Sequence, residues 1–136
     1  MLAENLTKYK SFVVPAGTYY LCDPCYVISN ADDWVGFLTS CYAEDSVGLS
    51  GHYEALLDGT KVLAFATAHG DGNYYDQHGN SFSVDSGLLG LVPYSYSPDY
   101  GDIERVGTQV EFTEDTLCFT RDGILTFGNH IIDTEE

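Results

Sequence analysis

Two cysteines at the spacing of a metal or redox motif are the first candidates for chemistry. Cys22 and Cys25 flank an Asp-Pro pair, and no second pair of this kind follows. A structural zinc site needs four ligands, and a redox pair usually lies at a helix N-terminus, where the helix dipole lowers the thiol pKa. Because this pair lies between two expected strands, the sequence favours buried structural thiols and predicts neither a metal nor a cofactor.

Acidic and histidine side chains near predicted turns are the second set. Residues 69–73 (HGDGN) depart from an EF-hand calcium loop, because the glycine comes too early and the later glutamate is missing. Asp85 borders an apolar run, so we expect a buried carboxylate that is hydrogen-bonded or paired. Two interpretations stay open, namely turn-forming residues or a small pocket that hydrolyses or sequesters a ligand. The pocket candidates are Asp23, Cys25, His69, Asp71 and Asp85.

Other arrangements for catalysis have less local support. A nucleophilic Cys25 with His52 or His69 as its base has no protease signature around it, and His78 and His130 are expected to be structural. The sequence contains no phosphate-binding loop, dinucleotide-binding glycine pattern or nucleophile elbow. The sequence therefore establishes no catalytic chemistry.

The elements that would position these residues are mostly strands. Apolar and polar residues alternate from Phe12 onward, with Gly, Asp and Asn at the breaks, which predicts strands and hairpins. One segment has helical spacing instead and predicts an amphipathic helix over about residues 31–43, with Asn30 as N-cap and two aspartates in the first turn. The expected fold class is α+β, mostly β, a curled antiparallel sheet or sandwich of about eight strands with the helix over one opening. The apolar stripe of this helix comprises Trp34, Phe37, Leu38, Cys41 and Tyr42.

The expected strands can be placed along the chain. They are residues 18–23, 25–28, 53–57, 61–69, 73–75 and 81–84, followed by a meander over residues 108–133. Hairpin turns are expected at residues 58–60 and 76–80. Residues 92–107, rich in proline and tyrosine, are predicted to form an ordered surface loop.

Size and charge limit the possible functions. A chain of 136 residues suits one domain, here residues 1–136. The 21 Asp and Glu against 5 Lys and Arg give a net charge of -16, which disfavours direct nucleic-acid binding and attracts basic partners. The N-terminus lacks an export signal and no apolar run approaches the roughly 20 residues of a membrane span. We therefore expect a cytoplasmic protein with reduced cysteines and no membrane association.

Three motifs together carry a resemblance. Asp-Pro-Cys-Tyr at residues 23–26, Gly-Asp-Gly-Asn-Tyr at 70–74 and Val-Asp-Ser-Gly at 84–87 flank the tryptophan-containing helix. In this combination the chain resembles small uncharacterised proteins encoded in phage and prophage genomes, over about residues 18–93. The family pattern usually has Gly where this chain has Cys22, and no activity is established for it. The resemblance thus implies a setting, the cytoplasm of a host cell, and no mechanism.

In that setting the acidity indicates a binding function. We expect an accessory or anti-defence protein that binds and blocks a basic host protein, for example a nucleic-acid-binding protein whose groove accepts an imitation of DNA charge. Tyrosines suit such a surface because they offer rigid contact area with a polar tip. The expected contact residues are Tyr94, Tyr96, Asp99, Tyr100, Asp102 and Glu104. A virion or structural role is a third possibility, for which the sequence has no repeat or coiled-coil signal.

Overall fold

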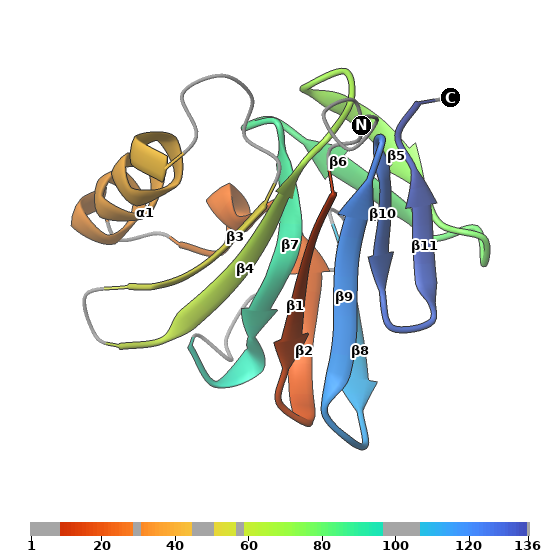
Figure 1. Cartoon of the computed structure of the whole chain (residues 1–136), viewed down its shortest axis with the longest axis horizontal. Helices are drawn as coiled ribbons and strands as arrows, with labels where there is room; N and C mark the ends of the chain where they lie inside the picture. Colours follow the sequence, from red (N-terminus) through yellow and green to blue (C-terminus); the bar gives the residue numbers. More distant parts are fainter. Residues whose placement is uncertain (1–8, 29–30, 45–50, 57–58, 97–106, 136) are drawn as a thin grey trace, which may run out of the picture.

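The computed structural model describes residues 9–28, 31–44, 51–56, 59–96 and 107–135, and these form eleven strands, one α-helix and short 3-10 turns (Figure 1). The expected class, mostly β and antiparallel with one amphipathic helix, is confirmed. The described strands are more numerous than the eight or so expected. They are β1 (Tyr9–Val14), β2 (Gly17–Cys22), β3 (Gly51–Ala55), β4 (Lys61–Ala66), β5 (Gly72–Tyr75), β6 (Ser81–Val84), β7 (Leu88–Pro93), β8 (Thr108–Phe112), β9 (Thr116–Arg121), β10 (Ile124–Phe127) and β11 (His130–Asp133).

The strands form a five-stranded sheet in the order β3-β4-β7-β2-β8, a four-stranded sheet in the order β1-β9-β10-β11, and the hairpin β5-β6. The five-stranded sheet lies between the four-stranded sheet and helix α1 (Ala31–Glu44) (Figure 1). Strands covered on both faces need apolar residues at successive positions. This explains why β7, with the sequence LLGLVP, is buried over five consecutive residues.

Two apolar cores lie on the two faces of the five-stranded sheet. The larger one joins the two sheets and the β5-β6 hairpin, with Phe65, Phe82 and Phe127 wholly buried. The smaller one lies beneath α1, where Phe37 is buried and Trp34 half-buried. Both residues belong to the predicted helical stripe, so the helix prediction is confirmed on its described side chains. The described part does not include the side chains of Leu38, Cys41 and Tyr42, and it does not include Asn30, the predicted N-cap.

The C-terminal meander prediction is wrong at its first turn. β8 pairs with β2 in one sheet, whereas β9 pairs with β1 in the other, so residues 113–115 cross between sheets. The connection from β1 to β2 crosses beside it, and Ala16 N donates to Asp115 Oδ1 across 3.2 Å. Sandwich corners of this kind arise where strands change sheets. The remaining part, β9-β10-β11, is the antiparallel meander that the sequence predicts.

The strand expected over residues 25–28 is also wrong. Pro24–Tyr26 form the 3-10 turn η2, because the Asp23 side chain accepts a hydrogen bond from Cys25 N and caps the turn. Both predicted hairpins, β3-β4 and β5-β6, are present. In the second, Gly79 has a φ of 88°, the left-handed conformation that glycine adopts without strain.

The centre of the five-stranded sheet depends on a close approach of two backbones. Gly90 of β7 is paired with Ala64 of β4, and a Cβ atom at Gly90 would lie 1.8 Å from the carbonyl oxygen of Leu63. Only glycine fits this position.

Among the described helices, none is long and apolar enough to cross a membrane.

Candidate functional site

Asp23 lies directly after β2 and is completely buried. Its Oδ1 accepts hydrogen bonds from Cys25 N (2.9 Å) and the Ser86 hydroxyl (2.7 Å). Its Oδ2 accepts from the backbone N–H groups of Asp85 (2.8 Å) and Ser86 (2.7 Å). A buried carboxylate needs such partners. Asp23 therefore joins the end of β2 to the β6-β7 turn, and the Asp-Pro-Cys-Tyr and Val-Asp-Ser-Gly motifs meet at this point.

The neighbouring side chains are held in protonated forms. Burial, followed by the negative charge of Asp23, raises the pKa of Cys25 to about 12. Because the thiolate is the reactive form of cysteine, these surroundings oppose a nucleophilic role. Tyr26 donates from its hydroxyl to Asp85 Oδ2 (2.5 Å), and burial together with this bond raises the pKa of Tyr26 well above its ordinary value.

The sequence expectation that Asp85 is the buried carboxylate is wrong. Asp85 is exposed, and the buried carboxylate at this turn is Asp23, which accepts from the backbone N–H groups of Asp85 and Ser86. The reason is the direction of the chain after β6: Val84 points into the core, so the next side chain points outward.

His69 and Asp71 lie on the turn between β4 and β5, and both side chains are exposed. Gly70 O in this turn accepts from the Thr67 hydroxyl (2.6 Å) and the Tyr74 hydroxyl (2.9 Å). Thr67 N donates to Gly87 O (3.0 Å), so the turn lies beside the β6-β7 turn. The structure thus brings Asp23, Cys25 and Asp85 together and leaves the other two candidates on an adjacent turn. Within the described ranges, no three His, Cys, Asp or Glu side chains are placed to hold a metal ion.

Tyr94 and Tyr96 lie in the 3-10 turn η3 (Tyr94–Tyr96), and both are half-buried against the core beneath α1. The Tyr94 ring lies 5.3 Å from that of Tyr20, and the Tyr96 hydroxyl donates to Asp33 Oδ2 (3.0 Å). Each tyrosine therefore has a packing role as well as an exposed edge. The other predicted contact residues, Asp99, Tyr100, Asp102 and Glu104, lie outside the described residues.

A second buried carboxylate, which sequence reasoning missed, lies after β5. Asp76 accepts from His78 N and Asn80 N at Oδ1 and from the Asn80 side-chain amide at Oδ2, each at 2.9 Å. His130 Nδ1 lies 3.3 Å from Asp76 Oδ2, and the His78 ring is 5.6 Å from the His130 ring. Burial opposes ionisation of Asp76, but these hydrogen bonds outweigh it and lower the pKa. The Asp-x-His-x-Asn spacing of residues 76–80 is a local sequence signal for the hydrogen bonds within the turn. No sequence signal connects His130 with Asp76, because the two residues are 54 positions apart.

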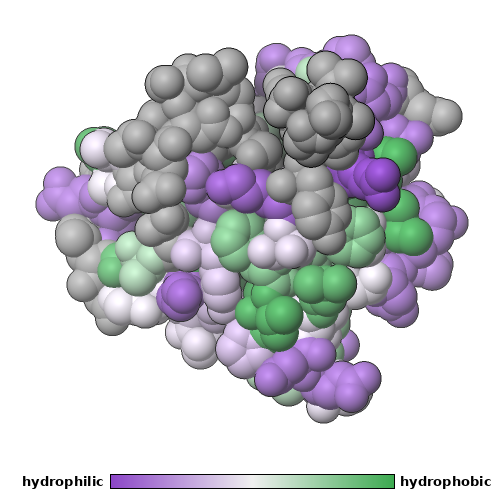
Figure 2. All heavy atoms as spheres, in the orientation of Figure 1, coloured by the Kyte–Doolittle hydropathy of each residue, from purple (hydrophilic) through white to green (hydrophobic). Residues whose placement is uncertain are grey.

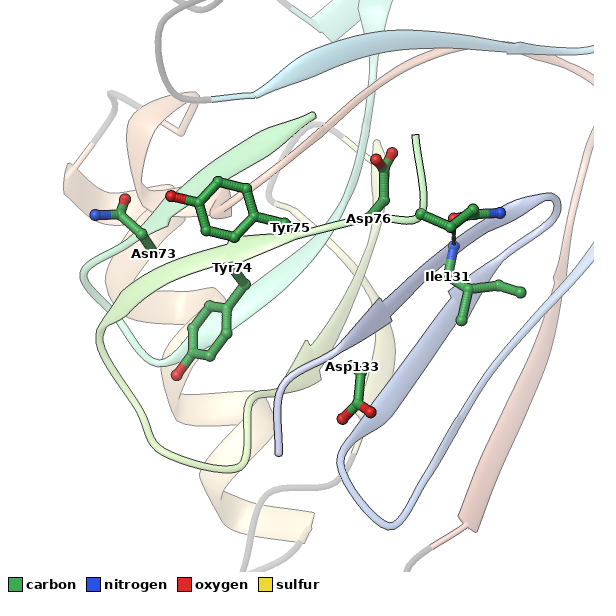
Figure 3. A pocket seen from close by; sticks show the side chains of 7 residues that line it. Asn73, Tyr74, Tyr75, Asp76, Ile131 and Asp133 are labelled. Atoms are coloured by element: carbon green, nitrogen blue, oxygen red, sulfur yellow. Dashed lines mark hydrogen bonds between the residues drawn. The ribbon is translucent and has the colours of Figure 1, made fainter. Parts of the chain in front are cut away.

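A groove of about 630 Å³ lies between β5 and β11 (Figure 3). Gln77 bridges one end of the groove, because its Nε2 donates to Asn129 O (2.6 Å) and its Oε1 accepts from Ile131 N (2.8 Å). This side chain occupies a backbone donor of the edge strand β11, which protects that edge from pairing with another strand. The residues that line the groove are Asn73, Tyr74, Tyr75, Asp76, Gln77, Ile131 and Asp133.

The surface of the described part carries an excess of carboxylates. Exposed basic side chains there are Lys61 and Arg121, with Lys10 half-buried, and Lys61 lies over the Tyr53 ring at 4.3 Å. Among the described residues, the contact within 4 Å between an acidic and a basic side chain joins Asp76 and His130. Asp76 is buried, so this contact neutralises none of the exposed carboxylates. The nine exposed carboxylates are Asp32, Asp71, Asp85, Glu111, Glu114, Asp115, Asp122, Asp133 and Glu135.

Comparison with protein-family models, curated proteins and solved structures gives no match to this chain. The resemblance to phage-encoded proteins therefore stays a prediction, and the function must be argued from the geometry.

Proposed function

We propose that this protein is a non-catalytic binding protein of the phage accessory or anti-defence type, which uses its acidic surface to bind and block a basic host protein. The observation that carries the proposal is the nine exposed carboxylates among the described residues, against Lys61 and Arg121 as exposed cations. A surface of one sign accelerates encounter with an oppositely charged partner and disfavours other partners.

Most of this charge is available to a partner. Three of the exposed carboxylates accept hydrogen bonds within the protein, Asp85 from Tyr26, Asp115 from Ala16 and Asp133 from Glu135. The other side chains lack such bonds within the described part. They are Asp32, Asp71, Glu111, Glu114, Asp122 and Glu135.

The candidate pocket gives less support to the alternative, a hydrolase or ligand-sequestering protein. The carboxylate oxygens of Asp23 are occupied by four donors from the protein, and the Cys25 thiol stays protonated at neutral pH. Both observations fit a structural role, in which Asp23 joins the turn after β2 to the β6-β7 turn. A binding function is therefore the better account of the side chains that remain unoccupied.

Affinity capture from a host lysate tests the proposal. The bait is the purified protein, and the control bait is an unrelated protein of similar size and net charge. We expect specific recovery of a basic protein whose dissociation constant rises steeply with salt, because exposed charge contacts are screened. If the specifically captured proteins are neutral or acidic and their binding does not depend on salt, the proposal is wrong. If the captured protein binds DNA, competition by a DNA duplex tests charge imitation.

A further inference from the structure

The four-stranded sheet has an outer face with exposed apolar side chains, one on each strand. Val13 of β1 is 57% exposed and is paired in register with Leu117 of β9, which is 50% exposed. Ile124 of β10 and Ile131 of β11 are 39% and 44% exposed. Their neighbours along the strands are buried in the core, so these side chains point to the opposite side. Those buried neighbours are Val14, Cys118, Leu125 and Ile132.

The apolar side chains of β1 and β9 lie next to each other on the surface, because Val13 and Leu117 are cross-strand partners. Figure 2 shows hydrophobic residues over β1 and β9 on the face toward the viewer, with hydrophilic residues below them, where the connection between β8 and β9 lies. Scattered single apolar residues are normal on protein surfaces, whereas a contiguous group of exposed apolar residues indicates an interaction site.

Carboxylates border this face at both ends. Glu114 and Asp115 precede β9 at the end where Leu117 lies, and both are exposed. At the other end, Asp133 is paired with Ile124, and Asp122 occupies the β9-β10 turn. Arg121 is the exposed cation of the described part that lies near them. The face therefore combines exposed apolar side chains with carboxylates at both ends and with one arginine, Arg121, beside Ile124.

We propose that this face docks an amphipathic segment of the basic partner, with apolar side chains over Val13, Leu117, Ile124 and Ile131 and with Lys or Arg at its ends. The inference rests on the proposed function, since it names the surface and the chemistry of the partner. Charge complementarity decides between occupants. A second copy of this chain, with a net charge of -16, would bring carboxylates against carboxylates, whereas a basic segment pairs with them.

The exposures set the size of the expected effect. Each of the four side chains keeps about half of its surface available for burial by a partner. Burial of the remaining half of an aliphatic side chain corresponds to roughly a three- to tenfold change in Kd per side chain.

Two synthetic ten-residue peptides of equal charge test the inference, one alternating Leu and Lys and one alternating Ser and Lys. We expect the Leu–Lys peptide to bind the full-length protein more tightly, and V13S and L117S each to weaken it about three- to tenfold. V35S is the matched control, because Val35 on α1 is 61% exposed and lies beyond the five-stranded sheet. Melting temperatures of the three variants check that each is folded.

The outcomes separate this inference from the proposed function. Equal Leu–Lys binding by wild type, V13S and L117S overturns the docking face, and so does an equal loss in V35S. If neither peptide binds at low salt, the acidic-surface proposal fails as well. If sedimentation shows a dimer that V13S or L117S dissociates, the face is an interface between copies and the inference is wrong.

Discussion

Replacing Asp23 with asparagine removes one oxygen and adds an amide nitrogen at a completely buried position. Both oxygens of Asp23 accept from backbone N–H groups, Oδ1 from Cys25 and Oδ2 from Asp85 and Ser86. Whichever way the asparagine amide is oriented, its NH2 group must face at least one of these donors. We therefore expect D23N to be destabilising, although it preserves the shape of the side chain.

The hydrogen bonds determine the magnitude. Hydrogen bonds to a charged group contribute about 1.5–3 kcal/mol each, and shared bonds are not additive. The more favourable orientation keeps the oxygen on the N–H groups of Asp85 and Ser86 and turns NH2 toward Cys25 N–H and the Ser86 hydroxyl, which can rotate to accept. It loses one bond to a charged group and places NH2 against one N–H group, so D23N should cost about 3 kcal/mol. S86A removes the hydroxyl that donates to Asp23 and that accepts a longer hydrogen bond from Leu88 N (3.3 Å), and it should cost about 1–2 kcal/mol.

Urea unfolding followed by circular dichroism measures these free energies of unfolding at pH 7. The double variant D23N/S86A should be less destabilised than the sum of the single variants, because the two side chains share a bond. If the free energy of unfolding of D23N is within about 1 kcal/mol of wild type, the hydrogen bonds of Asp23 do not stabilise the fold as described, because replacing a buried charged acceptor should cost more than this.

Three further predictions concern other parts of the structure. Because the pKa of Asp76 is lowered in the folded protein, its stabilising effect is present above about pH 4 and is lost as the pH falls; D76N should therefore destabilise at pH 7 and have a smaller effect at pH 3. Cys25, whose pKa is raised to about 12, should react with iodoacetamide at pH 8 at least about tenfold more slowly than in urea, by peptide mass spectrometry. Gly90→Ala should cost about 3 kcal/mol or more in urea unfolding, whereas Gly36→Ala, with no atom within 4 Å of its added Cβ, should be neutral or stabilising.

Each of these has a contrary result. An equal effect of D76N at pH 3 and pH 7 would show that the hydrogen bonds of Asp76 do not depend on its charge. Alkylation of Cys25 as fast in the folded as in the unfolded protein would contradict its protected environment. A stable Gly90→Ala protein would mean that β4 and β7 lie farther apart than described.

The fold class could be predicted because its signals are local. Alternation along strands, glycine in turns and helical spacing around Trp34 each depend on a few neighbouring residues. Sheet membership is not local. β8 and β9 have the alternation of a hairpin, yet they lie in different sheets because each pairs with a strand near residue 10 or 20.

The sites were harder to predict for the same reason. Asp23 and Ser86 are 63 residues apart in sequence, and Asp76 and His130 are 54 apart. The turn motif around Asp85 indicated a hydrogen-bonded carboxylate, but a single sequence could not show that Asp23 supplies it. The outer face of the four-stranded sheet was hidden because β9 has apolar residues on both faces, so alternation did not reveal which side is exposed.

The most direct test of the acidic-surface account compares two variants of the six exposed carboxylates that are free of hydrogen bonds in the described part. One variant neutralises all six (Asp→Asn, Glu→Gln), and the other keeps every charge but exchanges Asp and Glu. The measurement is the Kd for the captured basic protein at low and high salt. The account predicts that the charge-conserving variant binds like wild type, while the neutral variant binds at least about tenfold more weakly and with less salt dependence. Wild-type affinity in the neutral variant would contradict it. The six residues are Asp32, Asp71, Glu111, Glu114, Asp122 and Glu135.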